Sequence, residues 1–347
     1  MAPVRNARVI FNEVPTDYPI PGKTVVYDES ETIDLDNVPL NGGILVKVLA
    51  LSIDPYLRRM MIGPDAENFI PTFKLGQPIV NYGIAVVARS ENPAIKQGAH
   101  VVGLIDRQFP FQEYAIVHDL STVRVVENSE RLPWSLYLGV LGMPGQTAYY
   151  GWSEFARPKK GDVVFVSAAS GSVGATVVQF AKAEGLKVIA SAGSEEKVAF
   201  VKAIGADVAF NYKTTSTREV LEREGPINIY WDNVGGETLE AAIDFSARHT
   251  RVIVCGNISA YNTTEPYGVK NLQLLLWREI TLHGFLFISL EPKYLEEFFK
   301  TIPKRIASGE IKYKEHIVRG LENAGQAILD VQMGKNLGKS VVVVADE

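Results

Sequence analysis

The chain has 347 residues, 46% hydrophobic and 22% charged, which is longer than one hydrophobic core normally grows, so we expect two domains. Its formal net charge of −5, with basic residues scattered along the chain, argues against nucleic acid or an anionic membrane as a partner. The single cysteine, Cys255, excludes an internal disulfide, and no stretch approaches the roughly 18 apolar residues of a membrane span, so we expect a cytoplasmic protein.

Residues 1–133 are predicted to form a mostly antiparallel β domain. Strand-like runs in this part are separated by Gly, Pro, Asn and Asp signals, and long helical patterns are few. The predicted strands cover residues 44–50, 79–88, 100–105 and 111–117.

Residues 134–310 alternate short branched runs with helix-like stretches, and six such units predict a parallel, doubly wound α/β sheet. The expected strands cover residues 163–167, 187–192, 207–212, 227–234, 250–256 and 280–285. The expected helices cover residues 175–184, 195–204, 216–223, 237–247, 269–277 and 292–308. A last strand is expected at 341–345, and we predict that residues 311–347 return to the first domain.

The segment VVFVSAASGSVG, residues 163–174, indicates a dinucleotide-binding turn. Its apolar run reads as a strand buried on both faces, and a helix-like stretch follows the turn. Gly171 and Gly174 allow the backbone to approach phosphate oxygens and the helix to pack on the strand. The pattern A-x-x-G-x-x-G starts at Ala168 and has one glycine fewer than the commonest dinucleotide-binding fingerprint. The prediction therefore depends also on the strand before the turn and the helix after it.

The end of the second expected strand favours NADPH over NADH. It reads ASAGS, without the acidic residue that selects the free 2′-hydroxyl of NAD, and Lys197 can reach a 2′-phosphate. A solvated helix lysine is an equally frequent role for Lys197. Tyr212, after the third strand, either holds that phosphate or covers the adenine edge.

The chain resembles the zinc-independent alkenal double-bond reductases of the medium-chain dehydrogenase/reductase superfamily. This branch includes leukotriene and prostaglandin reductases. The motifs that carry the resemblance over nearly the whole length are DPYLRRM (54–60), GMPGQTAY (142–149), AASGSVG (168–174), SAGSEEKV (191–198), FNYK (210–213), DNVGGE (232–237), CGNISAYN (255–262) and KNLGKSVVVV (335–344). The resemblance implies a GroES-like catalytic domain, a Rossmann NADPH-binding domain and a homodimer.

The predicted NADPH contacts combine this resemblance with the glycine turn and the end of the second strand. They are Met143, Thr147, Gly171, Ser172, Val173, Gly174, Gly193, Lys197, Tyr212, Asn233, Cys255, Ile258, Tyr261, Phe285, Phe287 and Asn336.

No metal site is expected. One cysteine and five histidines without paired spacing do not supply the ligands of a tetrahedral zinc. Alcohol oxidation then lacks its usual Lewis acid, whereas reduction of an activated C=C bond does not need one. Hydride delivered to the β-carbon of an enal or enone gives an enolate that hydrogen-bond donors can stabilise.

Three tyrosines are candidates for the residues around the substrate. Tyr261, on a loop at the carboxyl end of a strand, is the first choice as proton donor, and water is the alternative. Tyr56 is expected to orient the substrate and is the second catalytic candidate, and Tyr82 is expected to line the pocket. With 14 tyrosines in the chain, packing is a strong alternative for each. Arg58 and Arg59 are expected to be surface or salt-bridge residues.

Two further positions keep alternatives open. Gly235 and Gly236 are expected to form a tight turn with positive φ, next to Asn233, which contacts the cofactor or closes its own turn. Phe285 and Phe287 line an apolar substrate pocket, lie at a subunit contact or belong to the core.

The leading hypothesis is an NADPH-dependent reductase of α,β-unsaturated aldehydes and ketones. A zinc-free quinone oxidoreductase is the alternative enzyme, and a nucleotide-sensing protein without turnover is the alternative outside catalysis.

Overall fold

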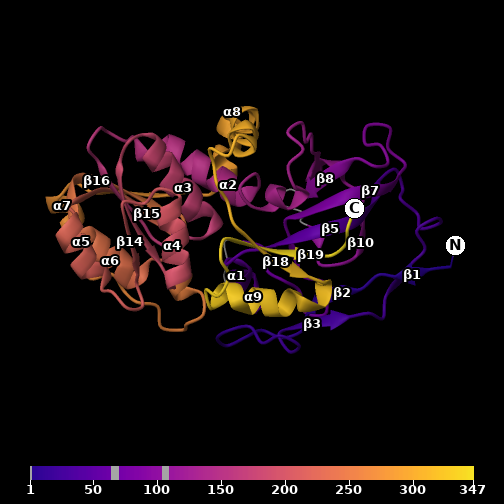
Figure 1. Ribbon diagram of the computed structural model, residues 1–347. Helices are drawn as coiled ribbons and strands as arrows, with labels where there is room; N and C mark the ends of the chain where they lie inside the picture. The colour runs from indigo at the N-terminus through magenta and orange to yellow at the C-terminus, as the bar shows by residue number, and fades with distance from the viewer. Residues whose placement is uncertain (1, 64–69, 104–108) are drawn as a thin grey trace. The chain divides into compact units, whose positions relative to one another are not determined.

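A computed structural model describes residues 2–63, 70–103 and 109–347, and Figure 1 shows its helices and strands. These residues divide into two compact units. The antiparallel unit comprises Met1–Leu138, Glu315–Asn336 and Ser340–Glu347, and the parallel unit comprises Gly139–Lys314 and Leu337–Lys339. The predicted boundaries follow residues 133 and 310, whereas the units change over after residues 138 and 314.

The antiparallel unit is built on a sheet with the strand order β11-β8-β7-β5-β19-β18, and β10 also pairs with β5. Antiparallel pairing of β5 with β7, β10 and β19 confirms the predicted class of this part of the chain. These strands are β5 (Ile44–Ile53), β7 (Gly83–Ser90), β8 (His100–Gly103), β10 (Tyr114–Val117), β11 (Val123–Val125), β18 (Glu315–Arg319) and β19 (Lys339–Val343). The end of the strand predicted at 100–105 lies outside the described residues.

Shorter elements complete the antiparallel unit. They are the strand pairs β1 (Val4–Arg5) with β4 (Thr32–Ile33), β2 (Arg8–Phe11) with β3 (Val25–Asp28), and β6 (Val80–Asn81) with β9 (Phe109–Pro110), and the helices α1 (Leu57–Met60) and α9 (Ala324–Gln332). The strand predicted at 79–88 is therefore split at Tyr82, because β6 pairs with β9 while β7 pairs with β5.

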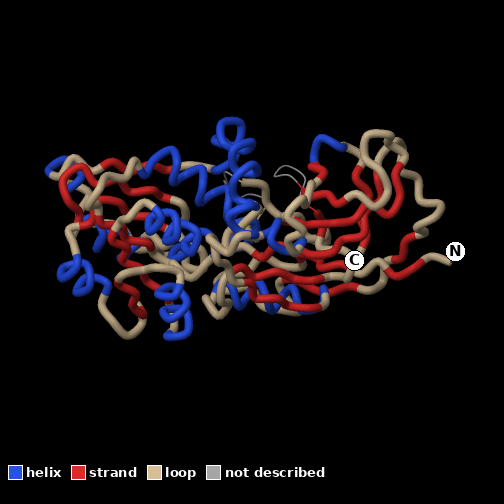
Figure 2. Tube along the Cα trace, turned by 45° about the horizontal axis from the view of Figure 1, so that its top comes forward, coloured by secondary structure: helices blue, strands red, loops and turns tan. Residues whose placement is uncertain are grey.

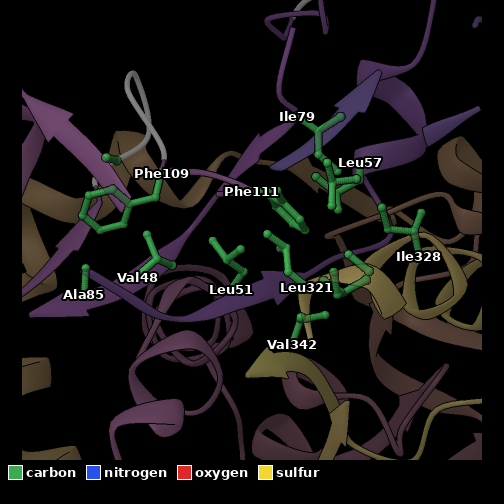
Figure 3. Close-up of a cluster of buried hydrophobic side chains, with 14 of the residues drawn as sticks. Val48, Leu51, Leu57, Ile79, Ala85, Phe109, Phe111, Leu321, Ile328 and Val342 are labelled. Carbon is green, nitrogen blue, oxygen red and sulfur yellow. The ribbon is translucent and has the colours of Figure 1, made fainter. Parts of the chain in front are cut away.

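The core of the antiparallel unit joins distant parts of the chain. Figure 3 shows Leu51 and Phe111 in one cluster with Leu321, Ile328 and Val342 from the C-terminal segment. All five side chains are almost completely buried. Burial of apolar side chains is thus what ties the C-terminal segment to this unit.

The parallel unit contains a sheet with the strand order β14-β13-β12-β15-β16-β17, in which every neighbouring pair is parallel. This is the doubly wound order in which two βαβ halves diverge from the first strand, so the predicted fold class is confirmed. Figure 2 shows its strands in red among blue helices. The strands are β12 (Val163–Val166), β13 (Lys187–Ala192), β14 (Val208–Asn211), β15 (Ile227–Asp232), β16 (Ser246–Val254) and β17 (Thr281–Gly284).

The helices of the parallel unit are α2 (Met143–Gly151), continued by a π-helical turn at Trp152–Ala156, α3 (Ser172–Ala183), α4 (Glu195–Ala203), α5 (Thr217–Glu224), α6 (Gly236–Asp244), α7 (Leu274–Trp277) and α8 (Phe287–Ala307). Among the described residues, no helix is long and apolar enough to cross a membrane.

Four predicted helix boundaries are wrong by three or more residues, and the first is the start of α3, which lies at Ser172 and not at Ala175. The helix predicted at 237–247 ends at Asp244 because Ser246 already pairs with Ile227 in the sheet. The stretch before Leu274 is a loop, since Asn271 donates hydrogen bonds to the backbone and side chain of α6 residues. The last helix starts at Phe287, five residues before Pro292, so Pro292 lies inside it and leaves one N–H missing from its hydrogen bonds.

We expect Phe111→Ala to lower the free energy of unfolding of the antiparallel unit by about 3–5 kcal/mol, because it leaves a cavity in the core of Figure 3. Leu75→Ala, at a side chain with 54% exposure, is the control and should change the same quantity by less than about 0.5 kcal/mol. Denaturant titrations of both variants measure the difference, and equal effects would contradict the assigned core.

Candidate active site

The turn after β12 brings the start of α3 against the backbone. A Cβ atom on Gly174 would lie 2.7 Å from the carbonyl oxygen of Ala168 and 2.8 Å from Cα of Ala169. Both distances are shorter than real Cβ contacts, so only glycine allows α3 to start this close to β12. The predicted role of Gly174 in helix packing is confirmed.

Gly171 precedes α3 and has a different environment. Its backbone N–H donates to the carbonyl of Ala168 at 3.1 Å, and a Cβ atom there would have ordinary contact at 3.4 Å. No side chain caps the first turn of α3, whose backbone N–H groups and dipole favour an anion. A small group next to Gly171 therefore meets no close protein atom, and an anion there would be favoured by the first turn of α3.

A buried carboxylate builds the turn after β15. Oδ1 of Asp232 accepts hydrogen bonds from the backbone N–H of Val234 at 2.9 Å and Gly235 at 2.8 Å, and from the Tyr230 hydroxyl at 2.7 Å. Burial raises the pKa of Asp232, and the hydrogen bonds oppose that shift. Gly235 and Gly236 have φ values of 72° and 53°, which confirms the predicted turn.

Asn233 connects the ends of two strands. Its Nδ2 donates to the carbonyl of Ser167 at 2.6 Å, and its Oδ1 accepts from Nε1 of Trp231 at 3.2 Å. The Oγ of Ser167 accepts from the backbone N–H of Asn233 at 3.0 Å and lies 3.1 Å from the hydroxyl oxygen of Tyr230, whose proton goes to Asp232. The residue that closes the turn is therefore Asp232 and not Asn233, whose predicted cofactor contact stays a prediction.

Lys197 of α4 and Lys213, which follows β14, form a basic cluster. Lys197 is only 8% exposed, so a solvated helix lysine is wrong for this position. Burial lowers the pKa of Lys197, and the nearby charge of Lys213 lowers it further. The Tyr212 ring covers Gly193, where a Cβ atom would lie 3.2 Å from its hydroxyl oxygen. This cluster offers positive charge and a phenol to an anionic group.

The loop after β16 holds Cys255, Ile258 and Tyr261. Ile258 starts a short 3-10 helix that Tyr261 ends, and the hydroxyl oxygen of Tyr261 accepts a hydrogen bond from the backbone N–H of Asn257 at 3.4 Å. That bond does not use the phenol proton. Burial raises the pKa of the Cys255 thiol to about 12, with the charge of Asp232 as the second cause, so this thiol is not a nucleophile at neutral pH.

Phe285 and Phe287 pack against residues of α2 and β15. A Cβ atom on Gly151 would lie 2.5 Å from Cζ of Phe285, whose ring meets Trp231 edge-on at a centroid distance of 6.0 Å. The Phe287 ring stacks on Tyr150 at 6.5 Å. Both phenylalanines therefore have packing roles within the parallel unit.

Two α2 residues and two residues of the first α3 turn complete the predicted set in the parallel unit. They are Met143, Thr147, Ser172 and Val173. Thr147 donates its hydroxyl hydrogen bond to the carbonyl of Met143 at 2.8 Å, within α2.

The remaining candidates belong to the antiparallel unit. Tyr56 precedes α1, Tyr82 lies between β6 and β7, and Asn336 follows α9. The Tyr56 hydroxyl donates a hydrogen bond to Oδ1 of Asn81. Nδ2 of Asn81 donates to the carbonyl of Ser52 at 2.6 Å and to Oδ2 of Asp54 at 3.0 Å.

Arg58 differs from its expected surface role. It is buried, and its guanidinium donates to the backbone carbonyls of Asp17 at 2.8 Å and Pro15 at 3.2 Å. A buried arginine that holds a loop through backbone carbonyl groups is structural.

Several polar residues around these sites have roles that do not follow from the sequence alone. Ser167 and Lys213 lie within recognised motifs, but their neighbours Asn233 and Lys197 come from other parts of the fold. Asn81 directly precedes Tyr82, and only its buried position reveals its role. Within residues 2–63, 70–103 and 109–347, no three His, Cys, Asp or Glu side chains lie together in a way that could hold a metal ion.

Comparison with known proteins adds two family matches and close relatives. Residues 172–304 match the family model described as "Zinc-binding dehydrogenase", and residues 24–125 match "N-terminal domain of oxidoreductase". The chain is 40% identical over 336 residues to a zinc-type alcohol dehydrogenase-like protein of Schizosaccharomyces pombe, with 95% of each chain covered. It is 41% identical over 354 residues to the NADP(+)-dependent 2-alkenal reductase of Nicotiana tabacum, with 99% of each covered.

A solved structure is similar over the whole chain. CurA from Vibrio vulnificus in complex with NADPH has 31% sequence identity and a TM-score of 0.86, covering 98% of this chain and 100% of that one.

Two glycines of the same turn should give opposite results when replaced by alanine. Gly171→Ala meets no close protein atom, so we expect unchanged thermal stability but at least about tenfold weaker NADPH binding, because the methyl group occupies phosphate space. Gly174→Ala clashes with the backbone and should lower the free energy of unfolding by about 1–3 kcal/mol. Calorimetric melting and NADPH titration separate the two effects. Normal NADPH binding by Gly171→Ala would contradict the phosphate site.

Proposed function

This chain belongs to the zinc-independent branch of alkenal double-bond and prostaglandin reductases within the medium-chain dehydrogenase/reductase superfamily, and from that premise we propose that it uses NADPH to reduce the C=C bond of α,β-unsaturated aldehydes and ketones. The observation that carries the proposal is the uncapped N-terminus of α3 at Gly171, in a chain that also has the basic cluster of Lys197 and Lys213 and is 41% identical to a 2-alkenal reductase.

The cofactor fits the residues of the parallel unit. The turn at Gly171 and the N-terminus of α3 would hold the pyrophosphate, and Lys197 with Tyr212 would hold the 2′-phosphate. The relative solved with NADPH supports the same cofactor here. Asn233, Cys255, Ile258 and the other predicted contacts are part of this proposal.

NADPH held by these residues would supply a hydride for the β-carbon of the enal or enone. The electrons of the C=C bond then move to the carbonyl oxygen, and the resulting enolate takes a proton at the α-carbon from Tyr261 or from water. Tyr261 suits this role because it ends the short 3-10 helix after β16, on a loop at the carboxyl end of the parallel sheet, where such folds bind their ligands. Tyr56, Tyr82 and Phe285 are assigned to the substrate pocket.

The reaction is proposed to proceed without a metal ion. One cysteine and five histidines are few for a tetrahedral zinc site, and the described residues contain no cluster of metal ligands. Hydrogen-bond donors can stabilise an enolate without a Lewis acid.

We also propose a homodimer in which the two copies meet at the β17 edge of the parallel sheet. Among the described strands, β17 pairs only with β16, and Leu282 of β17 is exposed. Trp277 and Leu286, which flank this strand in the chain, are 74% and 62% exposed. A second copy that pairs with this edge would cover the apolar side chains. Sedimentation of the wild type and Leu282→Lys tests this, and two monomeric samples would contradict it.

The reaction is tested by incubating the purified protein with NADPH and a panel of enals, enones and quinones. Mass spectrometry of the products should show saturated aldehydes and ketones. Hydroquinones as the main products would favour a quinone oxidoreductase, an allylic alcohol would exclude double-bond reduction, and NADPH binding without any oxidation would favour a non-catalytic sensor.

We expect Tyr261→Phe to lower kcat at least about tenfold, a loss of about 1.4 kcal/mol of transition-state stabilisation, because the phenol proton is removed. Tyr267→Phe is the control, since the Tyr267 hydroxyl donates to Glu240 and has no assigned role. Steady-state rates at saturating enone compare the two variants. An unchanged rate for Tyr261→Phe would assign protonation to water.

We expect Lys197→Ala to raise the KM for NADPH at least about tenfold and the KM for NADH much less, because only NADPH carries the 2′-phosphate. Lys202→Ala, at an exposed position on the same helix, is the control and should leave both values near those of the wild type. If Lys197→Ala raised the KM values for NADPH and NADH equally, the basic cluster would have no role in the choice between the two cofactors.

A further inference from the structure

The side-chain amide of Asn233 has its orientation determined at both ends. Its Nδ2 donates to the carbonyl oxygen of Ser167 at 2.6 Å, and its Oδ1 accepts from Nε1 of Trp231 at 3.2 Å. A backbone carbonyl only accepts hydrogen bonds, and an indole N–H only donates them. A flipped amide would place acceptor against acceptor and donor against donor, so both partners exclude it.

This orientation places the NH2 group at the start of the phosphate turn. Ser167 follows β12 and directly precedes Ala168, whereas Asn233 follows β15, which pairs with β12 in parallel. β13 and β14 extend the sheet on one side of β12 and β15 extends it on the other, and doubly wound sheets bind ligands outside the carboxyl ends of the strands at this point. Asn233 therefore offers an N–H at the edge of the sheet where a ligand is expected.

The amide has one hydrogen left for such a ligand. Within the described part of the chain, Nδ2 of Asn233 donates only to Ser167, which uses one of its two hydrogens. Asn233 is partly exposed, whereas Trp231, which holds the oxygen, is completely buried. The oxygen is thus directed to the interior, and the free N–H belongs to the group at the phosphate turn.

Packing fixes the indole ring of Trp231. The ring of Phe285 meets it edge-on at a centroid distance of 6.0 Å, and a Cβ atom on Gly151 would lie 2.7 Å from its Cη2 atom. Only glycine at position 151 therefore leaves room for the ring. The Cys255 thiol also interacts with the indole N–H, but an amide oxygen is a stronger acceptor than a thiol sulfur. The N–H is thus directed at Asn233.

We infer that Trp231 is a positioning residue for the cofactor, whose indole N–H holds the Asn233 oxygen so that the NH2 group donates to an acceptor oxygen of NADPH. The inference rests on the proposed function for the identity of the cofactor. It gives the predicted contact of Asn233 a direction and names the residue that determines it. Because the ring is completely buried, Trp231 acts through Asn233 and does not touch NADPH.

The first test removes the indole N–H and keeps the size of the ring. Site-specific incorporation of benzothienylalanine at position 231 puts a sulfur atom in place of the N–H. Calorimetric titration should show about three- to tenfold weaker NADPH binding, the effect of one hydrogen bond. Phe298→Leu, at another completely buried ring, is the control and should lower thermal stability without changing NADPH binding. Unchanged NADPH binding by the folded isostere protein would overturn the inference.

A double-mutant cycle tests whether Trp231 acts through Asn233. Asn233→Ala should itself weaken NADPH binding, and in that background the isostere at position 231 should change the dissociation constant by less than about twofold. A residue that only stabilises the fold would cause the same loss in both backgrounds, and this result would overturn the positioning role. Normal NADPH binding by Asn233→Ala would also overturn it, because the amide would then have no contact with the cofactor.

The hydrogen bond can also be tested without the cofactor. In NMR spectra of the isotope-labelled protein, the indole N–H signal of Trp231 is assigned through its loss in Trp231→Phe. In Asn233→Ala this signal should shift and its hydrogen exchange should become faster, because the acceptor is removed. An indole signal that Asn233→Ala does not change would overturn the inference.

These outcomes are distinct from the fate of the proposed function. NADPH binding without reduction of any enone refutes only the proposed reaction, and the cycle and the NMR spectra still decide the role of Trp231. An indole signal unchanged by Asn233→Ala refutes only the inference. A protein that does not bind NADPH would refute both.

Discussion

The close approach of α3 to β12 is the constraint on which the candidate cofactor site depends. With hydrogen as the only side chain at Gly174, the first turn of the helix rests on the backbone of Ala168 and Ala169. The helix N-terminus then faces the carboxyl end of the sheet, where parallel doubly wound folds bind ligands. Around it, Ser167 and Asn233 connect the ends of β12 and β15, so the neighbouring turns keep one arrangement. Local packing and the direction of the helix dipole are thus set by the same few atoms.

Hydrogen-bond direction distinguishes the two tyrosines that residue type alone leaves equivalent. Tyr261 accepts from the backbone and Tyr56 donates to an amide oxygen, although both are phenols next to glycine-rich or polar turns. Donors and acceptors are not interchangeable in a buried network, because each unpaired polar atom costs free energy. The partner of each phenol therefore decides its chemistry as much as its place in the chain.

The sequence predicts the parallel sheet well because each strand is a short branched run, and β13 occupies the residues expected for it. It predicts the first residues of α7 and α8 poorly, since a loop held by Asn271 and a proline inside a helix depend on tertiary contacts. The glycine turn and Lys197 follow from local motifs. The roles of Ser167 and Asn81 do not, because their partners lie on segments that only the fold brings together.

The edge strand β17 has a consequence for the life of the newly made chain. A strand with one paired side offers a row of backbone groups to any other extended segment, and Leu282 adds an apolar contact. In the proposed dimer a second copy covers this edge, and before the two copies meet the edge can pair with an extended segment of another chain and begin aggregation. Dilution would prolong that exposed period, so recovery after refolding should depend on how soon two chains meet.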